Sequence, residues 1–238
     1  EQFLFIPTKS LADPGLWKTA LEESPEVVTG VSLLFQDWIK LISARAGPFA
    51  ALLTVMLLIA AVVFVWPVRR RLLGLGNRPG AITDPPEHRR AVSALAITLL
   101  ATALPLALGL AIYFGLNAFN LSPDRADKVM RSIFTAIVVY AYVHGLTRAL
   151  FAPGLPAWRI VHVDDAAARD LSWLILGAGA VSALSVLVSG VLDVVSAESE
   201  IKLLMSGLLS VAVALFVMRS LRVVARGMGA AEDLPETQ

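Results

Sequence analysis

The chain alternates between long, mostly apolar stretches and short charged connections. Five stretches have the length and polarity of membrane spans: residues 46–68, 91–116, 129–152, 171–192 and 203–218. A helix needs about 20 apolar residues to cross roughly 30 Å of hydrocarbon. The fifth stretch is about 24 Å long at 1.5 Å per residue, and we expect Lys202 and Arg219 to snorkel from its ends to the interfaces. The pattern predicts an all-α, polytopic membrane protein with about five spans over residues 46–226.

Residues 1–45 show a different pattern, that of short amphipathic helices. Asp13-Pro14 predicts an N-cap followed by proline in the first turn of one helix, and Ser24-Pro25 predicts the start of a second. The second helix has apolar residues on one broad stripe: Val28, Val31, Leu34, Phe35, Trp38 and Leu41. Such a helix either lies in the outer headgroup layer or packs on a neighbouring span.

Composition agrees with a membrane environment. The chain is 57% hydrophobic and 16% charged, with a mean hydropathy of +0.72, whereas soluble domains carry roughly 25% charged residues. Cysteine is absent, which excludes disulfides and thiolate metal sites. Because residue 1 is Glu, we expect the chain to begin inside a longer protein or after processing, and residues 227–238 to be a polar tail or a linker.

The distribution of arginine predicts the orientation. Three groups of basic residues fall on one side of a five-span arrangement: Arg69, Arg70, Arg71, Arg78, Arg89 and Arg90; Arg148, Arg159 and Arg169; and Arg219, Arg222 and Arg226. The positive-inside rule places this side in the cytoplasm. The N-terminus is then predicted outside, and the C-terminus inside.

Aromatic and basic residues near the cytoplasmic ends of the spans are candidate lipid anchors. We expect contact with anionic headgroups or the interface for Trp66, Arg69, Arg70, Arg71, Trp158, Arg159, Arg169, Trp173, Arg219 and Arg222.

The third span is the most polar. Tyr140, His144 and Arg148 follow each other at i, i+4 and i+8 and form one stripe. Ionisable groups within a span often mark function, but the interpretation we favour is that His144 and Arg148 reach the cytoplasmic headgroups. Pro105 is expected to kink the second span.

The fourth span is rich in small residues, among them Gly179, Ser182, Ala183, Ser185 and Ser189. Small side chains let helix backbones approach closely in a membrane. Helix packing is therefore favoured over a substrate path along this face.

The sequence gives no support for enzymatic chemistry. The three histidines, His88, His144 and His162, lie in different segments without metal-ligand spacing. No Ser-His-Asp order and no glycine-rich phosphate loop is visible. We expect no cofactor, no metal, no nucleic-acid partner and no evident small-molecule substrate, and membrane lipids as the main partners.

Two motifs carry a resemblance to a known family. A-P-x-x-P-A-W-R over residues 152–159 and D-D-A-A-A-R over residues 164–169 resemble the membrane region of large bacterial proteins of the small-conductance mechanosensitive channel family. Residues 13–17, D-P-x-L-W, are similar to part of that subfamily's periplasmic module, and the basic residues after the first span are similar too. The resemblance implies a homoheptameric channel of the bacterial inner membrane, with a periplasmic N-terminus, that opens under tension to release ions and osmolytes.

The family's pore helix and cytoplasmic β domain have no counterpart in these 238 residues. The resemblance therefore implies the N-terminal sensor part of such a channel, with the pore expected beyond Gln238, and no pore residue is carried over. Two alternatives stay open. One is a secondary transporter or permease subunit, motivated by the stripe at Tyr140 and by Pro105, although no internal repeat is visible. The other is a non-conducting scaffold that recruits partners through residues 1–45.

Overall fold

The structure, a computed structural model, describes residues 13–41, 43–44, 85–118, 124–152, 155–161, 163–195 and 199–232. Four long helices follow one another: α2 (Glu87–Ala118), α3 (Asp124–Phe151), α4 (Asp165–Val195) and α5 (Ser199–Glu232). A short 3₁₀ helix, η1 (Pro156–Trp158), lies between α3 and α4, and a further helix covers residues 14–41. The described part of the chain contains no strand, which confirms the all-α prediction.

Each long helix contains a stretch that is long and apolar enough to cross a membrane. These stretches are Glu87–Asn117, Arg125–Phe151, Asp165–Val195 and Glu200–Ala225. They correspond to the second to fifth predicted spans. The first predicted span, 46–68, with Trp66, and the three residues after it, Arg69, Arg70 and Arg71, lie outside the described residues. The helix that contains the fifth stretch runs over 26 residues, Glu200–Ala225, because flanking residues such as Glu200 and Arg222 are good helix formers and prolong the helix beyond its apolar part.

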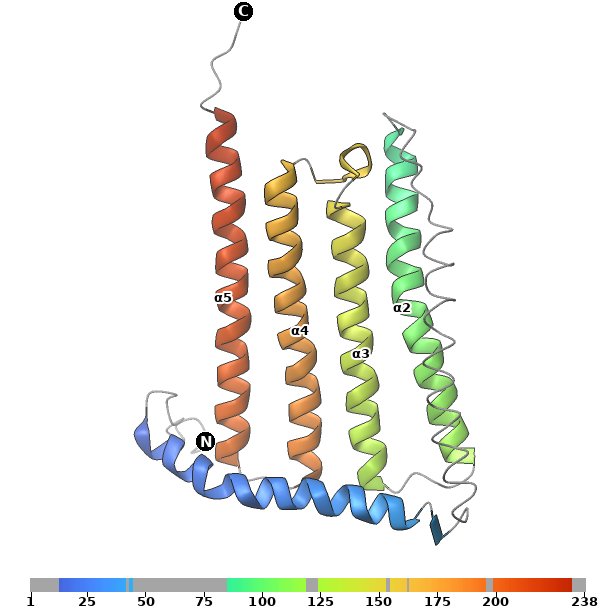
Figure 1. Cartoon of the computed structure of the whole chain (residues 1–238), viewed down its shortest axis with the longest axis vertical. Helices are drawn as coiled ribbons and strands as arrows, with labels where there is room; N and C mark the ends of the chain where they lie inside the picture. Colours follow the sequence, from blue (N-terminus) through green and yellow to red (C-terminus); the bar gives the residue numbers. More distant parts are fainter. Residues whose placement is uncertain are drawn as a thin grey trace, which may run out of the picture.

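The four long helices stand side by side in chain order and form a single layer (Figure 1). Contacts between them join α2 to α3, α3 to α4 and α4 to α5. Large apolar side chains on every helix stay exposed, for example Leu99, Ile137, Leu184 and Leu215. Soluble proteins rarely leave such broad apolar surfaces uncovered. The layer therefore fits a bilayer, in which each helix can present its free faces to lipid.

Small residues set the closest approaches between neighbouring helices. A Cβ atom on Gly179 of α4 would lie 2.6 Å from Val143 Cγ1 of α3, and one on Gly145 of α3 would lie 2.7 Å from Ala101 Cβ of α2. A Cβ atom on Gly190 would overlap Ser132 of α3. Neighbouring backbones are thus close enough to exclude even a methyl group at these positions.

The helix of residues 14–41 lies across one end of the layer, along the C-terminal ends of α2 and α4 and the N-terminal ends of α3 and α5 (Figure 1). Its first turns join a buried cluster of Leu16, Ala20, Leu192, Ile201 and Leu204. Near its other end, Trp38 packs against Leu116 and Met130. This helix therefore bridges the α4–α5 pair and the α2–α3 pair.

One helix replaces the two that were predicted before the first span. Asp13 Oδ1 accepts a hydrogen bond from Gly15 N at 2.9 Å, as expected of the cap. The predicted break at Ser24-Pro25 is wrong, because the helix continues through it. Pro25 has no N–H for the carbonyl of Leu21, and Ser24 Oγ donates to that carbonyl at 2.9 Å instead.

Pro105 lies inside α2, which is continuous on both sides of it. The ribbon of α2 changes direction about half-way along its length (Figure 1). Pro105 is the proline within α2, and proline removes a helical hydrogen bond, which is the usual cause of such a bend.

Candidate functional site: the two ends of the helical layer

The helix of residues 14–41 has three faces rather than two. At 100° per residue, the side chains that pack on the layer form one face: Leu16, Ala20, Val27 and Trp38. About 100° around lies an exposed apolar stripe of Trp17, Leu21, Val28, Phe35 and Ile39. The remaining third carries the polar side chains Lys18, Glu22, Glu26, Asp37 and Lys40.

These three faces bear on the alternatives left open by the sequence. The helix packs on the ends of the spans, so it does not lie on the headgroups alone. Yet Leu21 and Val28 are each 70% exposed, and an apolar stripe at the end of a membrane-spanning layer is well placed to enter the acyl boundary. The predicted single stripe is thus divided: Trp38 contacts the layer, whereas Val28 and Phe35 face outward.

At the opposite end, Arg159 holds the connection between α3 and α4. Its side chain is 6% exposed. Nε donates to the carbonyl of Phe151 at 2.9 Å, Nη1 donates to the carbonyl of Val163 at 2.8 Å, and Nη2 pairs with Asp165. The last carbonyls of a helix have no partner within the helix, so Arg159 satisfies one of them at the end of α3.

The burial of Arg159 corrects its prediction as a lipid anchor. Trp158 is also buried, at 3% exposure. The connection folds back after Pro156, and Ile160 N donates to the carbonyl of Leu150 at 3.1 Å. Both side chains therefore point into protein, and their role is to fix the connection.

Three other predicted anchors meet at a groove between α4 and α5. Trp173, Arg219 and Arg222 line a cavity of about 710 Å³, together with Asp170 and the apolar side chains of Leu174, Leu215, Met218 and Val223. Trp173 is 78% exposed, and Arg219 and Arg222 are exposed as well. An aromatic ring and two cations above an apolar floor suit a lipid headgroup and the start of its chain.

Arg169 lies near this end of α4 but does not line the groove. Its side chain is exposed, and its Nε donates to the carbonyl of Asp165 at 3.3 Å. Arg169 stays available to lipid headgroups, one helical turn before Trp173 on α4.

The polar stripe of α3 lies on a free face of the layer. The rings of Tyr140 and His144 are 6.3 Å apart, inclined by 41°. Tyr140 and Arg148 are exposed, and His144 is half-buried. The nearby hydroxyl of Thr147 donates to its own helix, to the carbonyl of Val143 at 2.7 Å. Within the described helices, the stripe is not enclosed as a polar path would be.

The small residues of α4 divide between its two neighbours. Gly179 and Ala183 are buried, with Gly179 against Val143 of α3. Ser182 and Ser185 line a cavity of about 310 Å³ with Leu209, Ser210 and Val213 of α5. Ser189 is exposed. The predicted packing stripe is therefore two contacts on different sides of one helix.

Two polar contacts between helices were not predicted from the sequence. Arg131 Nη2 donates to the Tyr113 hydroxyl at 2.7 Å and lies 2.9 Å from Asp127 Oδ2. Lys202 Nζ, expected to snorkel, lies 2.9 Å from Asp193 Oδ1 across the α4–α5 connection. The spacing of Asp127 and Arg131 at i, i+4 was a usable signal, whereas the contact with Tyr113 depends on how α2 and α3 align.

Comparison with known proteins adds no further assignment. No family model, no curated protein and no solved structure matches the chain. Among the described residues, no group of three or more His, Asp or Glu side chains could hold a metal ion. What stands is a multi-pass helical membrane protein.

Proposed function

We propose that the chain is the membrane-embedded sensing and anchoring region of a mechanosensitive channel. The observation that supports this most directly is the helix of residues 14–41, the bridging helix. It packs on both the α2–α3 pair and the α4–α5 pair and still has an apolar face for lipid. The sequence resemblance points the same way. The orientation is periplasmic for the bridging helix and cytoplasmic for Arg159, in a bacterial inner membrane, and the assembly is a homo-oligomer, a heptamer by resemblance.

Tension acts on the in-plane area of a protein. It favours the arrangement of helices with the larger area, and it shifts the population only by the free-energy difference that this area creates. A layer one helix thick can widen by tilting its members, without opening a central core. Close contacts at Gly145, Gly179 and Gly177 join α2 to α3, α3 to α4 and α4 to α5, so neighbouring helices tilt together.

Both leaflets must hold the layer if the layer is to follow the membrane. In the outer leaflet, the apolar stripe at Val28 and Phe35 provides this hold. In the inner leaflet, the groove at Trp173, Arg219 and Arg222 provides it. The layer then contacts lipid at both of its ends, one in each leaflet.

Patch-clamp recording under suction tests the proposal, with the full-length protein in spheroplasts that lack their own mechanosensitive channels. We expect tension-gated current. The pair Arg219→Gln and Arg222→Gln should raise the tension required, because it removes both cations from the groove. The matched control is Arg125→Gln with Lys128→Gln, which removes the same charge at the other end of the layer. A protein that reaches the membrane and gives no tension-gated current would sink the proposal.

The contact between Tyr140 and His144 motivates one alternative, a secondary transporter or permease subunit. Such proteins place their sites at discontinuous helices near mid-membrane, but α2 to α5 are continuous. Substrate-dependent uptake into proteoliposomes that is lost in His144→Ala would support this alternative. No uptake across a broad panel of solutes would leave it without support.

A further inference from the structure

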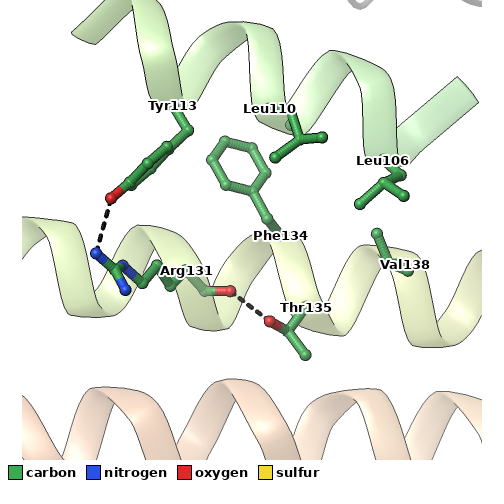
Figure 2. Close-up of a pocket in the computed structure, with 8 residues that line it drawn as sticks. Leu106, Leu110, Tyr113, Arg131, Phe134, Thr135 and Val138 are labelled. Carbon is green, nitrogen blue, oxygen red and sulfur yellow. Dashed lines mark hydrogen bonds between the residues drawn. The ribbon is translucent and has the colours of Figure 1, made fainter. Parts of the chain in front are cut away.

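A groove between α2 and α3 combines an apolar wall with a polar mouth. Its cavity measures about 380 Å³. Leu106 and Leu110 of α2 face Phe134 and Val138 of α3 along its length, and Tyr113 and Arg131 meet at one end (Figure 2). The groove is on the opposite face of α3 from the stripe at Tyr140, since nine residues at 100° separate Arg131 from Tyr140 by half a turn.

The mouth of the groove offers oriented hydrogen-bond donors. Both N–H groups of Arg131 Nη2 are occupied, by the Tyr113 hydroxyl and by Asp127. Its Nε and Nη1 carry three further N–H groups, and these make no hydrogen bond within the described part of the chain. The side chain of Arg131 is 62% exposed, and its guanidinium carbon lies 5.2 Å from the Tyr113 ring centroid. The Tyr113 hydroxyl accepts from Arg131, so its own proton remains to be donated.

The mouth lies at the depth of lipid headgroups. After Arg131, α3 has no charged residue before Arg148, and those 16 intervening residues span about 24 Å at 1.5 Å per residue. Arg131 is therefore at one edge of the hydrocarbon. From there the groove descends to Val138, about 10 Å deeper along the helix axis.

We propose that this groove binds one phospholipid. The phosphate accepts hydrogen bonds from Nε and Nη1 of Arg131 and from the Tyr113 hydroxyl, and one acyl chain lies between Leu110 and Phe134 and on toward Val138. Three features select a phospholipid over another helix: the exposed cation at the mouth, the depth of that cation, and an apolar wall that starts directly below it. Planar guanidinium groups suit phosphate oxygens in particular. The site requires only that the chain spans a bilayer, so it stands or falls independently of the channel proposal.

Photolabelling tests the site, with the purified chain in nanodiscs that contain phosphatidylglycerol carrying a diazirine on one acyl chain. After illumination, adducts are mapped by peptide mass spectrometry. We expect them on residues 106–113 and 131–138. Arg131→Gln should reduce this labelling about tenfold, since hydrogen bonds to charged groups contribute about that much. Thr135→Trp should abolish it, because Thr135 lines the groove and the indole would fill it.

Matched variants separate the site from ordinary lipid contact. Arg125→Gln removes a cation from the same helix, and Ile137→Trp adds an indole on its opposite face, so both should keep full labelling. The double variant Asp127→Asn/Arg131→Gln leaves no unpaired carboxylate and should still lose the labelling. Diacylglycerol with the same photoreactive chain has no phosphate. It should therefore label the wild-type groove no more strongly than phosphatidylglycerol labels Arg131→Gln. Equal labelling on both faces of α3, or labelling that survives both Arg131→Gln and Thr135→Trp, would overturn the proposal in favour of non-specific annular lipid.

Discussion

At the scale of single residues, Arg159 decides how α3 is joined to α4. It is buried and bonded to the carbonyls of Phe151 and Val163 and to Asp165. Arg159→Ala should destabilise the protein by about 2–4 kcal/mol, because it leaves buried acceptors unsatisfied. Arg159→Lys should recover only part of this, since an ammonium cannot reproduce a planar fork. Thermal unfolding in detergent measures the effect, and the exposed Arg169→Ala is the control. Equal midpoints for the two alanine variants would contradict this role.

Ala152 is a second residue whose conformation can be tested. It follows α3 with φ of 37°, in the left-handed region that favours glycine after a helix. Ala152→Gly should stabilise the protein by up to about 1 kcal/mol by relieving this strain, whereas Ala149→Gly, inside α3, should destabilise it. The same unfolding assay compares them. A lower midpoint for Ala152→Gly than for the wild type would show that loss of its buried methyl group outweighs the strain.

Residue roles could be predicted only where they depend on neighbours in sequence. The cap at Asp13 was predictable because its acceptor and donor are two residues apart. The sequence marks Arg159 and Arg219 alike as basic residues beside a span, yet one is buried and the other lines an open groove. The difference arises because the α3–α4 connection folds back on itself, and this depends on packing that local sequence does not encode.

At the scale of elements, the closest contacts between helices make the sharpest prediction. A Cβ atom on Gly190 would overlap Ser132, whereas one on Gly115 would meet nothing within 4 Å. Gly190→Ala should therefore cost about 1–3 kcal/mol through displacement of α4 from α3, and Gly115→Ala should be neutral or stabilising by up to about 1 kcal/mol. Unfolding by denaturant in mixed micelles gives both values. Partial rescue of Gly190→Ala by Ser132→Gly would identify the overlap as the cause.

The three faces of the bridging helix can be separated by chemical labelling. The chain has no cysteine, so single substitutions report one position each. In membranes, a charged maleimide should modify Gln36→Cys on the polar face and leave Val28→Cys on the apolar stripe largely unmodified. After detergent solubilisation, the extent of modification should stay the same for Gln36→Cys and increase for Val28→Cys. Full modification of both residues in intact membranes would mean that the stripe faces water.

Among the elements, the long helices were predictable and the helix over 14–41 was predictable only in part. The length of the mostly apolar stretches locates α2 to α5, because lipid requires continuous helices with satisfied backbones. The break at Pro25 was predicted because Ser24-Pro25 has the pattern of an N-cap followed by proline in the first turn of a helix. The compensating hydrogen bond from Ser24 to Leu21 was overlooked, although both residues are local.

At the scale of the whole molecule, the orientation predicts an outcome for each connection. Alkaline phosphatase fused at residue 120 or 198 should be active, because the α2–α3 and α4–α5 connections are expected in the periplasm. Green fluorescent protein fused at residue 78, 159 or 238 should fluoresce, because the arginine-rich end is expected in the cytoplasm. A dark fusion at 238 beside a bright one at 159 would mean that α5 does not cross.

The single-layer arrangement also has a consequence for how the protein is made. The main contacts between the long helices join consecutive elements, so the contact order of the layer is low and each hairpin can form as soon as it has been synthesised. The bridging helix is the exception, because Leu16 packs with Leu204, which is made long after it. Its docking must therefore wait until α5 has inserted. The earliest described helix to leave the ribosome is then the last to reach its place.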